Sequence, residues 1–146
     1  MNIDKALQNW IIQNESLTDY PLFSWLNEKN GAVAIIPIPT ESGREFIGGR
    51  VKEVTYDFMV QAALRMSDTT DDLNTENMMT LRQWQDWVDE QEIAGNYPDF
   101  GEGYGGYELQ NLSDMPAIAE IDKDGEMAIF QFPVRLIYLK EIKKWQ

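Results

Sequence analysis

Carboxylates are the main side chains of this sequence that could support acid–base or metal chemistry. Two short segments are rich in them, one with Asp68, Asp71 and Asp72 and the other with Asp122, Asp124 and Glu126. Calcium prefers several oxygen ligands from one loop, so each segment is a candidate cation site. The second segment lacks the glycine and the closing glutamate of a calcium loop, and its DKDG sequence at 122–125 is typical of a hairpin turn. We therefore expect no functional metal and no cofactor.

The set of possible catalytic groups is limited because the chain contains no histidine and no cysteine. This excludes Ser-His-Asp and Cys-His catalytic groups, zinc sites built from those residues, and disulfides. Asp86 and Glu90 lie one helical turn apart, but such pairs on an exposed helix face are usually solvated. The glycine run at 101–106 precedes a strand and lacks the Gly-Lys-Ser/Thr ending of a phosphate loop, so we interpret it as a mobile loop. We expect a protein that is not an enzyme, with a carboxylate-based or calcium-dependent enzyme as an alternative.

Four aromatic side chains around this glycine run are suited to binding another protein. They are Tyr97, Phe100, Tyr104 and Tyr107. Aromatic rings on a loop supply a large contact area at a small cost in side-chain entropy, which is why tyrosine is frequent at interfaces. We predict a partner-binding surface here; the alternative is that two of the four rings pack back onto the core.

The formal net charge of −13 over 146 residues is unevenly distributed along the chain. Residues 1–66 hold 6 basic and 8 acidic side chains, residues 67–126 hold 2 and 16, and residues 127–146 hold 4 and 1. An acidic field repels nucleic-acid phosphates, so we expect no tight binding to DNA. We predict that Lys140, Lys143 and Lys144 meet the acidic middle segment of a neighbouring subunit. A solvated acidic face, or an acidic inhibitor or adaptor that mimics DNA, is the alternative.

The hydrophobic pattern predicts two helices and several strands. Ile3, Leu7, Trp10 and Ile11 form one stripe of a first helix, and the second helix extends from about residue 75 to residue 94. We expect a short turn or helix at 22–26 and a loop at 40–50. Strands are expected at 32–39, 54–66, 107–112, 117–121 and 127–139. The longest nearly apolar run, 32–39, is far too short to cross a bilayer as a helix, so we expect a soluble protein without a membrane partner.

This order of elements predicts an α+β fold with a single domain over residues 1–146. We expect a two-layer sandwich: a mostly antiparallel, four- to five-stranded sheet with two helices packed on one face, in the order α-β-β-α-β-β. The other sheet face carries Met59, Ala63, Met127 and Ile129 among its polar residues. That face is too apolar for water alone, so we expect a neighbouring subunit to cover part of it.

Several segments resemble a known family. They are RQWQDWVDEQEIAGNYPDFG (82–101), YELQNL (107–112), FQFPVRLIYL (130–139) and FSWLNEKNGAVAIIPIP (23–39). These segments are similar to those of small minor capsid proteins from the head–tail modules of long-tailed phages and prophages of Gram-positive bacteria. The order of the elements resembles that of the tail terminator proteins.

The resemblance implies a structural virion protein, assembled in the bacterial host cytoplasm. Members of the tail terminator group form a hexameric ring that caps the tail tube and joins it to the head connector. The implied partners are further copies of the chain, a tail tube protein, and a head completion or connector protein. The family implies no catalytic residue.

Overall fold

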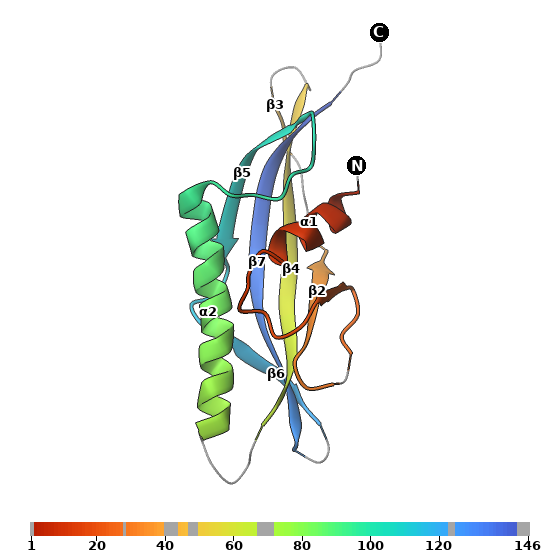
Figure 1. The fold of residues 1–146 in the computed structure, drawn as a ribbon. Helices are drawn as coiled ribbons and strands as arrows, with labels where there is room; N and C mark the ends of the chain where they lie inside the picture. Colours follow the sequence, from red (N-terminus) through yellow and green to blue (C-terminus); the bar gives the residue numbers. More distant parts are fainter. Residues whose placement is uncertain are drawn as a thin grey trace.

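Two long strands organise the fold, which is seen in a computed structural model that describes residues 2–27, 29–39, 44–46, 50–66, 72–122 and 125–142. These strands, β4 and β7, lie side by side at the centre of a mixed sheet (Figure 1). The elements in chain order are α1 (Ile3–Ile11), β1 (Pro21–Phe23), β2 (Ala32–Ile38), β3 (Arg44–Phe46), β4 (Val51–Arg65), α2 (Asp72–Ala94), β5 (Tyr104–Asn111), β6 (Ala117–Ile121) and β7 (Met127–Glu141). The α+β class predicted from the sequence is therefore confirmed.

The antiparallel pairing of β4 with β7 extends over all 15 residues of each strand, from Val51 opposite Glu141 to Arg65 opposite Met127. The sheet order is β1-β2-β4-β7-β5, while β3 pairs with β4 and β6 pairs with β7. Within the described ranges this gives seven strands, more than the four to five that we expected. The sheet is mixed because β1 and β2 are parallel, whereas the other pairs are antiparallel.

The two additional strands lie where other structures were expected. Residues 21–23 form β1 instead of a turn or helix, and β1 pairs in register with Val33 to Ile35 of β2. The loop expected at 40–50 contains the short strand β3. Both strands have only three residues, too few for an alternating pattern to be recognised in the sequence. Their pairing depends on the long strands that they join.

The prolines in the sheet lie where a missing N–H group costs little. Pro37 of β2 is beyond the residues that pair with β1. The carbonyl of Pro133, in the middle of β7, accepts a hydrogen bond from the Leu112 N–H at 3.0 Å, so its nitrogen faces the same side of the strand. On that side, β6 pairs with β7 up to Gln131 and β5 pairs from Val134 onward. Pro133 thus falls between two partner strands, where no ladder bond is lost.

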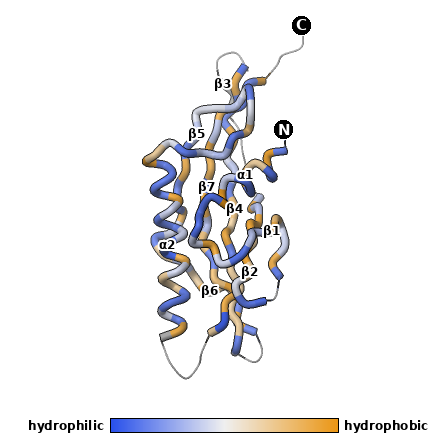
Figure 2. Tube along the Cα trace, in the orientation of Figure 1, coloured by the Kyte–Doolittle hydropathy of each residue, from blue (hydrophilic) through white to orange (hydrophobic). Residues whose placement is uncertain are grey.

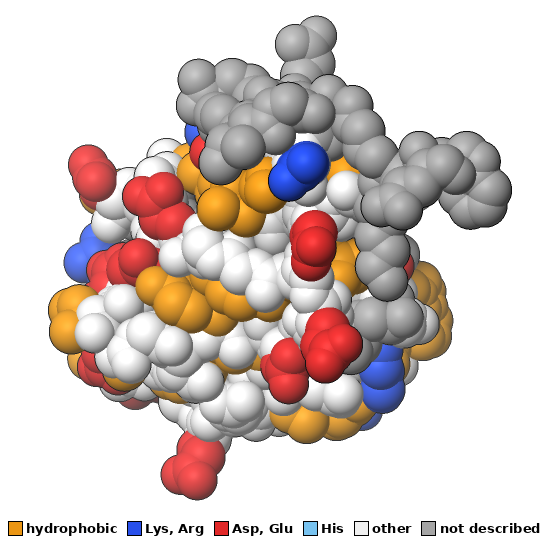
Figure 3. Space-filling view, turned by 90° about the horizontal axis from the view of Figure 1, so that it is seen from above, with side chains coloured by type: hydrophobic (Ala, Val, Ile, Leu, Met, Phe, Trp, Pro, Cys, Tyr) orange, Lys and Arg blue, Asp and Glu red, His pale blue; other side chains and the backbone are white. Residues whose placement is uncertain are grey.

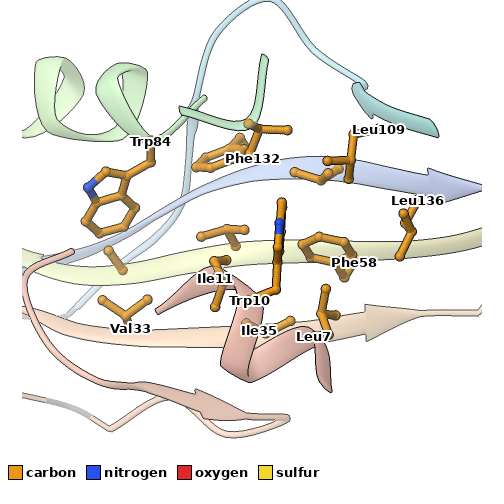
Figure 4. Close-up of a cluster of buried hydrophobic side chains, with 14 of the residues drawn as sticks. Leu7, Trp10, Ile11, Val33, Ile35, Phe58, Trp84, Leu109, Phe132 and Leu136 are labelled. Atoms are coloured by element: carbon orange, nitrogen blue, oxygen red, sulfur yellow. The ribbon is translucent and has the colours of Figure 1, made fainter. Parts of the chain in front are cut away.

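The two helices contribute to one hydrophobic core with the sheet. Asn2 caps α1 by accepting a hydrogen bond from the Lys5 N–H at 3.1 Å. In Figure 4 the labelled side chains of α1 and Trp84 of α2 point toward the same part of the sheet. The rings of Trp10 and Trp87 lie 4.8 Å apart and join the helices directly. Figure 2 shows hydrophobic and hydrophilic residues alternating along α2, as expected for a helix with one buried side.

Strand β5 begins earlier than we expected, at Tyr104 instead of Tyr107. The interpretation of the whole run 101–106 as a mobile loop is therefore wrong for residues 104–106, which belong to the sheet. The pairing of β5 with β7 shifts register between Gly105 and Glu108. Gly106 occupies this irregularity with φ of +59°, and a Cβ atom there would lie 2.7 Å from Cδ1 of Leu139. Glycine is required both for the backbone angle and for the close approach of Leu139.

Replacement of Gly106 tests this requirement. We expect Gly106→Ala to lower the free energy of unfolding by about 2–3 kcal/mol, because left-handed strain of about 1–2 kcal/mol adds to a steric clash. Gly125→Ala is the matched control, since its φ is +70° and a Cβ would meet nothing within 4 Å. Urea unfolding of the two variants measures the difference. Equal losses would contradict a contact of Gly106 with Leu139.

Candidate interaction surface

The segment between α2 and β5 folds around Tyr138 of β7. Phe100 is its anchor: the side chain is 1% exposed, and its ring centroid lies 5.0 Å from that of Tyr138 in an edge-on arrangement. The rings of Tyr104 and Tyr107 each lie 5.8 Å from Phe100. Edge-to-face pairs at such distances are favourable beyond the area that they bury. These rings, together with Tyr97, form what we call the aromatic cluster: Tyr97, Phe100, Tyr104, Tyr107 and Tyr138.

The four aromatic residues predicted to bind a partner are thus brought together, but they differ in exposure. Phe100 is buried and belongs to the core, whereas Tyr97, Tyr104 and Tyr107 are half-buried and offer part of each ring to solvent. Tyr97 stacks on Tyr107 with centroids 5.4 Å apart, and its hydroxyl donates to the Glu92 carboxylate at 3.0 Å. Three tyrosine rings therefore form a preorganised surface, while Phe100 holds them in place.

Burial keeps three tyrosines of the cluster, Tyr97, Tyr107 and Tyr138, uncharged. It raises the pKa of Tyr138 to about 12, with smaller contributions from the neighbouring Tyr104 and Tyr107. Burial is also the first cause of the raised pKa of Tyr107 and of Tyr97, and the hydrogen bond to Glu92 adds to it at Tyr97. Tyr97, Tyr107 and Tyr138 are therefore neutral at physiological pH. They provide apolar rings and hydrogen-bonding hydroxyls, and none is activated as an acid or a base.

Lys140 lies directly beside this cluster. It is exposed on β7 and is opposite Tyr104 in the pairing with β5. Lys140 and Tyr104 line one surface hollow together with Glu102, Gly103 and Glu141. The aromatic residues and the basic segment are separate in the sequence. The pairing of β5 with β7 brings Tyr104 and Lys140 together. The other two lysines predicted to bind a partner, Lys143 and Lys144, lie outside the described residues.

The second surface is the sheet face opposite the helices, which we call the outer face. Direct opposition across the ladders places Ile36, Met59 and Pro133 in one apolar row on it. Met127 and Ile129, two of the residues for which we expected an outside position, are half-buried on this face, and Ala63 is 4% exposed. Neither α1 nor α2 packs on it, because their buried residues belong to the core on the other side.

Polar pairs flank the apolar row on both sides. Arg135 donates from Nε to Oδ1 of Asp57 at 2.8 Å and from Nη2 to Oδ2 at 3.0 Å. Gln61 donates to the Oε1 atom of Gln131 at 2.8 Å. The Asp57 side chain is 6% exposed and that of Arg135 is 37% exposed, so one partner is almost desolvated. The hydrogen bonds to Asp57 raise the pKa of Arg135 above its ordinary value, so the guanidinium stays charged.

The alternation of apolar and polar residues places Asp57 and Arg135 on the polar side of their strands but does not pair them. The pairing depends on the register between two strands that are 78 residues apart at this point. The available signal is that each charge is at an odd position of its strand, whereas the even positions are apolar from 54 to 64 and from 128 to 138. Opposite charges on the same side of adjacent strands are candidates for such a pair.

The described residues of the two carboxylate segments do not form a metal site. Asp68, Asp71 and Asp124 lie outside those residues, and Asp72 begins α2. Within the described ranges no three acidic side chains come together in a geometry suited to a metal ion. Asp122 instead accepts a hydrogen bond from the Glu126 N–H at 3.0 Å, as a hairpin turn requires. Among the helices of the described part, none is both long and apolar enough to cross a membrane.

The Asp57–Arg135 pair generates a prediction about stability. We expect Arg135→Met to lower the free energy of unfolding by about 1–3 kcal/mol, because it leaves the desolvated Asp57 carboxylate without its partner. The double variant with Asp57→Leu should recover part of this loss. Urea unfolding of the two single variants and the double variant gives the coupling energy as a double-mutant cycle. A coupling energy near zero would show that the two charges act independently.

The aromatic cluster generates a prediction about alkaline pH. The ordinary pKa of tyrosine is about 10, and folding raises that of Tyr138 to about 12. Folding thus favours the neutral phenol, and the resulting stabilisation is complete below pH 10 and is lost as the pH rises through 12. We expect Tyr138→Phe to make the free energy of unfolding fall less steeply between these values. Denaturant unfolding at several pH values tests this, and an unchanged slope would contradict it.

Family models and curated proteins give no function for these surfaces. No protein-family model matches the chain, and no curated protein matches it. The features of the chain that bear on its function are therefore two surfaces: the aromatic cluster beside Lys140, and the outer face with its apolar row.

Proposed function

We propose that the chain is a structural virion protein, a minor capsid or tail terminator subunit that forms a ring at the phage head–tail junction. In this role it caps the tail tube and joins it to the head connector, without catalysis. The observation that carries the proposal is the outer face of the sheet. Neither α1 nor α2 covers its apolar row of Ile36, Met59 and Pro133, and apolar strips of this kind are typical of contacts between proteins.

A closed ring needs two different, complementary surfaces on every subunit. The chain has two candidates on separate parts of the fold. The outer face provides apolar contact area along strands that are about 50 Å long. The aromatic cluster and Lys140 provide a second surface at the end of β7, with half-buried tyrosine rings beside an exposed cation. Subunits that join one surface to the other would form a head-to-tail ring.

The net charge supports a role in which DNA passes through the ring without binding to it. Non-specific affinity for DNA comes from lysine and arginine side chains that neutralise phosphates. The net charge of −13 opposes this binding. Figure 3 shows acidic side chains spread over the described surface of one end of the molecule, with only a few basic ones between them. A tail channel with such a surface would let DNA pass.

The segments that resemble phage minor capsid proteins include residues of these surfaces. Segment 82–101 contains the second half of α2 together with Tyr97 and Phe100 of the aromatic cluster. Segment 130–139 lies within β7 and includes Pro133, Arg135 and Tyr138, while segment 23–39 contains β2. The quoted residues thus include parts of both proposed contact surfaces as well as core positions.

Assembly on a tail tube tests the proposal. We expect the purified chain to stop elongation of a polymerising tail tube protein and to appear as a ring at the tube end in electron micrographs. Met59→Asp should abolish both effects while the free subunit stays folded, because it places a charge in the centre of the apolar row. Ile93→Asp is the matched control, since Ile93 is 87% exposed on α2, away from the outer face.

Two results would overturn the proposal. One is a chain that neither assembles nor affects tube growth at any concentration tested. The other is equal capping by the wild type and by Met59→Asp, which would remove the outer face from the assembly. Circular dichroism of each variant establishes that loss of capping is not loss of folding.

A further inference from the structure

A hollow of about 280 Å³ lies on the outer face at the start of β7. Its apolar lining includes Ala63 of β4 and the side chains of Met127 and Ile129 of β7, with Leu26 at its border. The volume is below the roughly 300 Å³ at which pockets for small molecules begin. The hollow is therefore of a size to take one or two side chains of a protein partner.

Two carboxylates, Glu120 and Asp122, line the same hollow. Among the described residues neither has an ion-pair partner. Asp122 is held by its turn, where Oδ1 accepts from the Glu126 N–H, whereas Glu120 is exposed and opposite Ile129 in the β6–β7 pairing. Apolar walls with two acidic groups are complementary to side chains that are both apolar and cationic. Lysine combines these properties, with an aliphatic stem and a terminal ammonium.

The chain itself contains a segment with this chemistry. Residues 140–146 have the sequence KEIKKWQ, in which three lysines accompany an isoleucine and a tryptophan. This is the most lysine-rich stretch of a sequence whose net charge is −13. The acidic hollow and the basic segment are thus complementary in charge, and both contain apolar groups.

The two features cannot meet within one molecule. Met127 lies at the hollow and Glu141 at the far end of the same 15-residue strand, a separation of about 48 Å at 3.4 Å per residue. Residues 142–146, fully extended, reach about 18 Å. Figure 1 shows the C-terminal end of β7 opposite the end at which β6 lies. A contact between the hollow and this segment therefore requires a second copy of the chain.

We propose that the segment that follows β7, residues 142–146, of one copy binds in the Glu120–Asp122 hollow of the next copy. This inference rests on the proposed ring, for which it names the subunit contact. Each copy would give its basic segment to one neighbour and receive that of another, which is a heterologous contact that can close into a ring. One or two side chains of the segment enter the hollow against its apolar lining, and the two carboxylates pair with lysine ammonium groups.

Binding of a labelled peptide tests the contact directly. A fluorescein-labelled KEIKKWQ peptide is titrated with the full chain, and its fluorescence anisotropy is measured. We expect saturable binding that weakens with salt, and about tenfold weaker binding to Glu120→Lys, the loss of one well-placed charge pair. Asp122 is left unchanged because it closes the hairpin turn. Glu90→Lys is the matched control, with the same charge change on an exposed position of α2, and we expect it to bind as the wild type does.

A charge exchange separates a direct contact from a change in overall charge. In a second peptide, EEIEEWQ, the three lysines are replaced by glutamate. We expect this peptide to bind Glu120→Lys more tightly than it binds the wild type or Glu90→Lys. Equal affinities of KEIKKWQ for the wild type and Glu120→Lys, or no binding to the wild type, would overturn the assignment of the hollow.

The peptide experiment and the tail-tube experiment test the subunit contact and the head–tail role separately. If the chain caps tubes but does not bind KEIKKWQ, the ring stands and its subunits join through another contact. If the peptide binds with the expected charge dependence but the chain has no effect on tubes, self-association through the hollow stands and the head–tail role is wrong.

Discussion

The ladder between β4 and β7 is the constraint on which the rest of the structure depends. Side chains alternate between the two sheet faces, so the register of these 15-residue strands decides which residues meet the helices and which form the outer face. A slip of one residue would bring Asp57 or Arg135 into the core and expose Phe58 or Phe132. Burying either charge without its partner would cost far more than the slip could gain. One register is therefore strongly favoured.

Polar pairs on the outer face reinforce the same register. The Asp57–Arg135 and Gln61–Gln131 pairs form only when β4 and β7 are aligned as observed. They stand on either side of the apolar row that includes Met59, so the outer face combines specific polar contacts with apolar area. Such a mixture is typical of surfaces that stay soluble alone and become buried in an assembly. The register that builds the core thus also builds the candidate interface.

Periodicity in the sequence predicts the long elements well and their connections poorly. The stripe of α1 and the alternation in β4 and β7 extend over many residues, so both the elements and their buried sides follow from local pattern. The parallel pairing of β1 and the closure of Phe100 on Tyr138 depend on residues far apart in the chain. No local pattern contains that information. The hollow bordered by Leu26 and Glu120 was missed for the same reason, because β4, β6 and β7 must first be assembled.

The charge of the chain limits how its copies can associate. Subunits of net charge −13 repel one another, although screening confines that repulsion to about 8 Å at physiological salt. Contacts between identical copies must therefore bring local opposite charges or apolar area together within this distance. The chain separates these features spatially, with exposed Lys140 near the end of β7 and Glu120 near its beginning. This separation allows the Lys140 end of one copy to meet the Glu120 end of another copy, so that opposite charges come together.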